Sequence, residues 1–244
     1  MNRSLVAKAA GAFLMGTIAP IAFAGPVSVT ISDVTGVWSS VTGGTSVTGL
    51  GSDSVSWGTP TSNQSGYDFD GVAPPVQGPF SADVVFDLGT FTHRNFPIDA
   101  GTSITQAVLD VTITGTAVNG SAQPISVTSQ FIFSHFETDN GANPCADGGA
   151  NGSGVNSNGC ADIVTPVLNL GASETFTIDG ITYVFSTTGF DIGADFKTAE
   201  EQANSAKFQG FFTAVPVPAP ASLALTGLGL VGMAFARRRR FSKD

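Results

Sequence analysis

The chain has few of the residues that most often carry chemistry. Of its 244 residues only two are histidine, two are cysteine, and 12% are charged. It contains no Gly-x-Ser-x-Gly sequence, which is the nucleophile elbow of many hydrolases. It also has no internal repeat of the kind that builds solenoids and propellers. With no reaction signature present, we predict that the protein is not an enzyme.

Basic residues are scarce between the two ends of the chain. Seven of the ten lie in the first 24 or the last 30 residues, and the remaining three are Arg94, Lys197 and Lys207. The central part therefore has three basic residues against eighteen acidic ones, a net charge of −15. Such a surface repels phosphate backbones and anionic lipids. We expect no nucleic-acid partner.

The first 24 residues are typical of a secretory signal peptide. Arg3 and Lys8 provide a positive start, the segment 9–24 is mostly apolar, and Ala22-Phe23-Ala24 is a small-x-small cleavage pattern. We place the cut before Gly25. The expected partners at this end are the Sec translocon and signal peptidase.

The last 30 residues, 215–244, predict a membrane-directed tail. Alternate prolines exclude a helix over 215–220, and the segment 221–236 carries no charge. An apolar helix starting at Ala219 would have about 18 residues and a length of about 27 Å, enough for a bilayer core. The arginines 237–240 that follow favour a cytoplasmic C-terminus. We therefore expect a single transmembrane helix, with the rest of the protein outside.

A proline motif, an apolar span and an arginine cluster at the end of a chain together resemble a PEP-CTERM sorting signal. The resemblance implies recognition by an exosortase-type membrane enzyme in bacteria that make exopolysaccharide. The family's motif is usually Pro-Glu-Pro, and alanine replaces the glutamate here. The tail is therefore either cut near the motif or retained as an anchor. The residues that carry the sorting resemblance are Pro218, Ala219, Pro220, Arg237, Arg238, Arg239 and Arg240.

Residues 25–214 are long enough for one domain with one sizeable core. Short alternating runs of β-branched and aromatic residues lie between Gly and Pro punctuation, which predicts an all-β antiparallel sandwich. Asp179-Gly180 is the strongest hairpin signal. We expect a loop over 61–78 and a helical turn within 195–208. Roughly nine strands are expected, over 26–32, 34–41, 54–57, 83–92, 104–115, 125–135, 174–178, 181–186 and 208–215.

Cys145 and Cys160 are expected to form a disulfide, because exported proteins oxidise their cysteines. The bridge would close a glycine-rich loop and contribute about 3 kcal/mol in the chain-entropy model. Asp139, Asp147 and Asp162 lie in or near this loop and are candidate Ca²⁺ ligands. No EF-hand spacing is present, and acidic loops on exported proteins are more often only solvated. We therefore expect no cofactor and keep Ca²⁺ as the alternative.

The two histidines occur in unusual local sequences. Thr92-His93-Arg94-Asn95 matches the Thr-His-x-Asn signature, and His135 is followed by Phe136 and Glu137. With the tail, these sequences resemble the THxN family of PEP-CTERM proteins and the related choice-of-anchor exported β-domains. The similarity covers most of the central part. It implies export and surface association, and no established activity.

Two interpretations of the histidines remain. His135 and Glu137 are two apart, so on a strand they face the same side. If His93 lay close to them, two imidazoles and a carboxylate would form the ligand set of a catalytic zinc site. The favoured interpretation is structural, because a histidine at a strand end commonly bonds backbone carbonyls and stabilises a turn. Thr92, His93, Asn95, His135 and Glu137 are thus expected to be structural.

The expected function is that of a non-enzymatic domain in the cell envelope, on the cell surface or in the extracellular matrix. Its tail would sort it or anchor it to the membrane, and it would associate with exopolysaccharide in a biofilm. One alternative is a carbohydrate-binding module, although the few Trp and Tyr residues are expected in the core. The other is a metal-dependent hydrolase that uses His93, His135 and Glu137.

Overall fold

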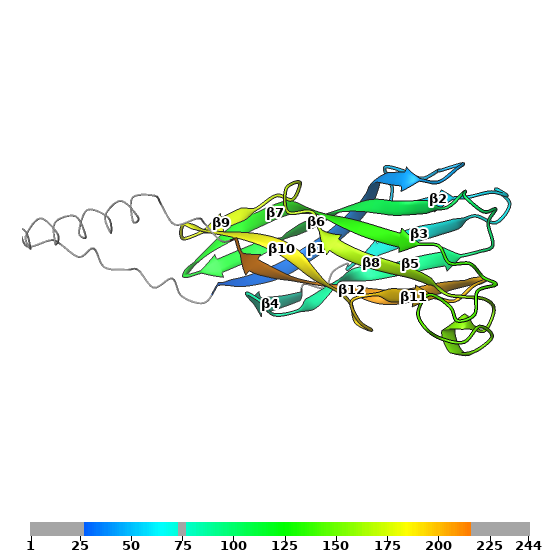
Figure 1. Ribbon diagram of the computed structural model, residues 1–244. Helices are drawn as coiled ribbons and strands as arrows, with labels where there is room; N and C mark the ends of the chain where they lie inside the picture. The colour runs from blue at the N-terminus through cyan, green and yellow to red at the C-terminus, as the bar shows by residue number, and fades with distance from the viewer. Residues whose placement is uncertain (1–26, 73–76, 216–244) are drawn as a thin grey trace, which may run out of the picture.

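A computed structural model describes residues 27–72 and 77–215. Twelve strands form two six-stranded sheets in which every strand pair is antiparallel, and the sheets lie face to face in an elongated sandwich (Figure 1). The all-β antiparallel fold expected from the alternating sequence is confirmed. The predicted signal peptide and the tail from residue 216 onward lie outside the described residues.

The first sheet has the strand order β11-β8-β7-β6-β1-β4. Its centre consists of three long strands, since β1, β6 and β7 have sixteen residues each. The bounds are β1 Ser28–Gly43, β4 Gln77–Ser81, β6 Ile104–Asn119, β7 Ser121–Phe136, β8 Asp162–Leu168 and β11 Phe196–Thr198.

The second sheet has the strand order β2-β3-β5-β12-β10-β9. The chain crosses between the two sheets several times, and the crossing from β11 to β12 takes only three residues. The bounds are β2 Ser54–Trp57, β3 Ser65–Gly71, β5 Phe86–Asn95, β9 Phe176–Ile178, β10 Ile181–Phe190 and β12 Gln202–Ala214.

The core fills the space between the inner faces of the two sheets. Leu109, Val111 and Ile113 of β6 are fully buried, as their alternation with polar residues predicts. Aromatic rings dominate the interior, and Phe91 of one sheet stacks on Phe133 of the other with 5.2 Å between ring centroids. Aromatic pairs at this separation stabilise a core beyond the area that they bury.

The structure has twelve strands where the sequence predicted roughly nine. Two expected strands, 26–32 and 34–41, are one continuous strand, β1. The prediction of a loop over 61–78 is wrong for half of its length, because β3 lies inside it and β4 begins at its end. β8 was also missed. β3 and β4 are short or rich in Gly and Asp, so their sequences favour a strand only weakly and pairing with neighbouring strands determines them. β8 contains Pro166, which weakens the strand signal of its β-branched residues.

The prediction of a helical turn within 195–208 is wrong. Residues Phe196–Thr198 form β11, which pairs with β8, and β12 begins at Gln202 and pairs with β5. Glu201, between the two strands, has a φ of 58° and reverses the chain. Hydrogen bonding to strands far away in the sequence therefore overrides the local preference.

The predicted hairpin at Asp179-Gly180 is confirmed. Asp179 has a φ of 49° and Gly180 a φ of 78°, and the two residues connect β9 to β10. A type I′ turn requires positive φ at both central residues, a conformation that Asp and Gly tolerate.

The two ends of the sandwich differ. β1 begins and β12 ends at the left end in Figure 1, whereas the long loop between β7 and β8 lies at the right end. The predicted disulfide between Cys145 and Cys160 lies in this loop and is confirmed. A 3₁₀ turn, Gly154–Asn156, lies within the ring that the disulfide closes.

Among the described residues, no helix has the length and apolar character needed to cross a membrane.

The disulfide is expected to stabilise the sandwich through the unfolded state. The cysteines are 15 residues apart, so replacing both by serine should lower the free energy of unfolding by about 3 kcal/mol. Chemical denaturation of both forms measures this difference. Wild-type protein in reductant is the control and should match the double variant. An unchanged free energy of unfolding would contradict the expectation.

Candidate functional site

The Thr-His-x-Asn segment lies on β5 and is divided between the two faces of its sheet. His93 and Asn95 point inward and are fully buried, because alternate residues of a strand face the same side. Thr92 and Arg94 point outward, where Thr92 bonds Ser205 of β12 at 2.7 Å. The inward pair brings polar groups into the interior, and such groups need partners there.

The outward pair stabilises the sheet. Arg94 lies 3.0 Å from a carboxylate oxygen of Asp68 on β3. Its guanidinium also donates to Ser54 and Ser56 and to the Val55 carbonyl of β2. Arg94 thus connects β5 across β3 to the edge strand β2.

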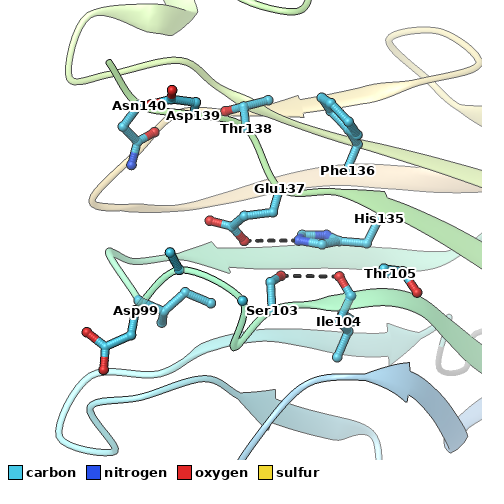
Figure 2. Close-up of a pocket in the computed structure, with 13 residues that line it drawn as sticks. Asp99, Ser103, Ile104, Thr105, His135, Phe136, Glu137, Thr138, Asp139 and Asn140 are labelled. Atoms are coloured by element: carbon cyan, nitrogen blue, oxygen red, sulfur yellow. Dashed lines mark hydrogen bonds and ion pairs between the residues drawn. The ribbon is translucent and has the colours of Figure 1, made fainter. Parts of the chain in front are cut away.

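His135 enters the same interior from the other sheet. It lies near the end of β7, and its ring centroid is 5.3 Å from that of His93. Its Nδ1 hydrogen-bonds the Tyr67 hydroxyl of β3 at 2.5 Å. Its Nε2 faces the Glu137 carboxylate at 3.3 Å, as Figure 2 shows. The two histidines therefore meet between the sheets, as the metal interpretation of the sequence required.

Three carboxylates surround the two imidazoles. We call the five residues together the inter-sheet cluster, which consists of His93, His135, Glu137, Asp162 and Glu200. Ligand atoms of His93, His135 and Asp162 lie within 4.8 Å of one another, and so do those of Glu137, Asp162 and Glu200. Asp162, shared by both groups, is the first residue of β8 and is 3.9 Å from Nε2 of His135.

Hydrogen bonds to residues outside the cluster hold His93, His135, Asp162 and Glu200. His93 Nδ1 bonds Thr198 Oγ1 of β11 at 2.6 Å. Asp162 Oδ1 accepts from the backbone N–H and the hydroxyl of Thr138. The Asn95 amide donates to Glu200 Oε1 at 2.9 Å and to the Thr198 carbonyl. One side of each of these residues is thus fixed, whereas Glu137 bonds only His135 among the described residues.

The inner side of the cluster is short of partners. Within the described part of the chain, three of its buried atoms have no hydrogen-bond partner: Nε2 of His93, Oδ2 of Asp162 and Oε2 of Glu200. Buried polar groups of native proteins are nearly always bonded, so each exception needs an explanation. Two of the three atoms, those of His93 and Asp162, belong to one group of potential ligands, which indicates a shared cause for these two.

Burial and like charge shift the pKa values of the cluster. Burial, aided by Glu137, raises the pKa of Asp162 to about 9. Burial also raises the pKa of Glu200 and lowers that of His93 well below its usual value, with His135 and Arg94 acting in the same direction on His93. At neutral pH His93 is therefore a neutral imidazole, and Asp162 holds a proton unless a cation replaces it.

An open pocket of about 740 Å³ reaches the cluster from one side (Figure 2). His135 and Glu137 form part of its wall, and Ile104 and Thr105 of β6 lie opposite. The Glu137 side chain is 29% exposed, whereas those of His135 and Asp162 are fully buried. Glu137 is thus the residue through which solvent reaches the cluster.

The proposed calcium ligands are not brought together. Asp162 belongs to the cluster, whereas Asp139 and Asp147 occur in neither group of potential ligands among the described residues. Asp139 accepts from the Gly141 N–H. Asp147 accepts from the Gly149 N–H and from Asn156, and lies 3.6 Å from the Lys197 ammonium. Both have local roles in the disulfide loop.

Several residues of the site have no signal in the sequence. Tyr67, Thr198 and Glu200 are far from either histidine along the chain. Strand pairing places Tyr67 and Thr198 in the site, and the turn between β11 and β12 places Glu200 there. His93 and Asn95, and likewise His135 and Glu137, could be paired from their spacing of two. No comparable spacing connects Asp162 or Glu200 to them.

The aromatic residues with polar groups are in the core, as the sequence predicted. Trp38, Trp57 and Tyr67 are fully buried and Tyr183 is 6% exposed. These are all the Trp and Tyr residues of the chain. Their rings are not available as the exposed stacking platforms that sugar-binding modules use.

The bond between Tyr67 and His135 is expected to stabilise the site. Tyr67→Phe leaves the buried Nδ1 of His135 without a partner, so the free energy of unfolding should fall by about 1–3 kcal/mol. Tyr183→Phe is the control, since the Tyr183 hydroxyl makes no hydrogen bond within the described residues. Urea denaturation should show a small change for this control. Equal losses in both variants would contradict the role of the bond.

Comparison with known proteins bears on the tail. Residues 216–240 match the model of the PEP-CTERM protein-sorting motif. No curated protein matches the chain. The resemblance that the proline motif, apolar span and arginines suggested is thus confirmed for the tail, whereas the THxN subfamily stays a prediction. The chain carries a PEP-CTERM sorting motif, which supports sorting to the cell surface by an exosortase-type enzyme.

Proposed function

We propose that this chain is an exported, non-enzymatic β-domain of the bacterial cell surface or extracellular matrix, associated with exopolysaccharide. The observation that carries the proposal is the match of residues 216–240 to the PEP-CTERM sorting motif. Export is also supported by the N-terminal 24 residues, which have the composition of a signal peptide. A disulfide in the central domain fits an oxidising compartment outside the cytoplasm.

The arrangement of the sandwich suits presentation at a surface. β12, the last strand before the tail, ends at the left end in Figure 1, and the disulfide loop with the inter-sheet cluster lies at the opposite end. A protein held by its C-terminus would therefore present the cluster end away from the attachment point. The strongly acidic central part would also keep neighbouring copies apart in solution.

The burial of the inter-sheet cluster supports a role without catalysis. His93 and the side chain of Asp162 have no solvent contact. A catalytic group must touch its substrate, and these two side chains are closed in between the sheets. The cluster therefore fits a structural role better than that of a hydrolase.

Sorting can be tested on the mature C-terminus. In a host that contains an exosortase-type enzyme, we expect mass spectrometry to find a chain that ends near Pro218. Replacing Arg237–Arg240 by glutamine should leave the full-length chain uncut. Lys243→Gln is the control, because Lys243 lies outside the matched residues 216–240. Wild-type protein that keeps its whole tail in that host would contradict processing and favour a retained anchor.

Matrix association can be tested in the producing bacterium. Deletion of the gene is expected to reduce the polysaccharide matrix or cell aggregation, and a copy with an intact tail should restore it. A copy that lacks residues 216–244 should be exported but should fail to restore the phenotype. An unchanged matrix after deletion would contradict the proposed association.

A further inference from the structure

The inter-sheet cluster has the geometry of an ion site whose ligands are already in place. The unpartnered atoms of His93 and Asp162 are both fully buried, and both residues belong to one group of potential ligands. Burying such atoms without a partner costs free energy that the fold would have to offset. A single cation at the centre would satisfy them together.

We infer that the cluster binds one Zn²⁺ ion between the two sheets. The ligands would come from His93, His135, Asp162 and Glu137.

The spacing of these groups is close to what zinc requires. Ligands about 2.1 Å from a tetrahedral ion are about 3.4 Å apart. Nε2 of His135 is 3.3 Å from Glu137 Oε2 and 3.9 Å from Asp162 Oδ2. The ligand atoms of His93, His135 and Asp162 all lie within 4.8 Å of one another. Small side-chain movements are therefore sufficient to close the ligands around an ion.

The groups around the ligands are those expected beside a zinc ion. Each imidazole bonds a hydroxyl through Nδ1, to Thr198 for His93 and to Tyr67 for His135. A hydroxyl oxygen can accept an Nδ1–H, which leaves the Nε2 lone pair for the metal. Asp162 is oriented through its other oxygen by Thr138. The ligands are thus held by a second layer of hydrogen bonds.

The ligand types select the ion. Ca²⁺ and Mg²⁺ prefer oxygen ligands, whereas two imidazoles with carboxylates suit Zn²⁺ and other first-row transition ions. The pocket gives the ion a route to the cluster. The charged side chains that line this pocket are the acidic Asp99, Glu137 and Asp139. A negative pocket raises the local concentration of cations.

A site with four protein ligands is closed, which is typical of structural rather than catalytic zinc. His93 belongs to β5 of the second sheet, and His135 and Asp162 belong to β7 and β8 of the first. The ion would therefore connect the two sheets at the end that carries the disulfide loop. This inference does not depend on the proposed surface function.

The first experiment measures metal in the full chain purified after export. We expect one Zn²⁺ per chain after dialysis, and a melting temperature that falls when a chelator removes the ion and recovers when Zn²⁺ is added. Ca²⁺ and Mg²⁺ should not restore it. Co²⁺ in place of Zn²⁺ should give the intense visible absorption of a tetrahedral site.

The second experiment uses variants. Glu137→Gln changes the one partly exposed ligand, so the metal-free protein should keep its fold while Zn²⁺ affinity falls by about tenfold or more. Glu201→Gln is the control, because it removes the same charge from an exposed residue next to the cluster. His93→Gln should abolish stoichiometric binding, and circular dichroism shows whether that variant still folds.

Three results would overturn the inference. The first is wild-type protein with no stoichiometric Zn²⁺ and a melting temperature that Zn²⁺ does not change. The second is Zn²⁺ affinity that is equal in wild type, Glu137→Gln and Glu201→Gln, which would place the ion elsewhere. The third is a melting temperature that responds to Ca²⁺ and not to Zn²⁺.

Discussion

The packing of the two inner sheet faces around a shared aromatic core is the contact on which the rest of the structure depends. Phe91 of β5 and Phe133 of β7 stack across the interface, and Trp38 of β1 lies within 6.2 Å of both rings. Each histidine is two residues beyond one of the stacked phenylalanines on the same strand, so the packing that places the rings also places the imidazoles.

A polar cluster next to an aromatic core has a large desolvation cost, and the structure offsets part of it. Thr198, Tyr67 and Asn95 bond the outer sides of the histidines and of Glu200. The inner sides face one another, and burial, aided by the nearby Glu137 carboxylate, raises the pKa of Asp162 to about 9. The charge of the Asp162 carboxylate can be neutralised by a proton or balanced by a cation, and a cation also satisfies the unpartnered nitrogen of His93.

The disulfide loop and the cluster form one structural unit. Cys160 is two residues before Asp162, and its carbonyl accepts from the Thr138 hydroxyl that also bonds the Asp162 carboxylate. The bridge restricts a loop rich in glycine and asparagine, and in doing so it fixes the start of β8. Exported proteins work outside the cell, without the chaperones of the cytoplasm. Under those conditions a covalent bridge next to a polar core stabilises the fold.

The sequence by itself determined the class of fold, the disulfide and the sorting motif. These depend on local patterns: alternation for strands such as β6, Asp179-Gly180 for a hairpin, two cysteines in an exported chain, and prolines, an apolar run and arginines in the tail. It also identified His93, His135 and Glu137 as one potential ligand set. Only the tertiary structure joined Asp162 and Glu200 to these residues and paired Tyr67 with His135. Only it showed that β11 and the start of β12 lie within 195–208. The physical reason is that strand pairing joins residues about 100 positions apart, and no local pattern records which strands become neighbours.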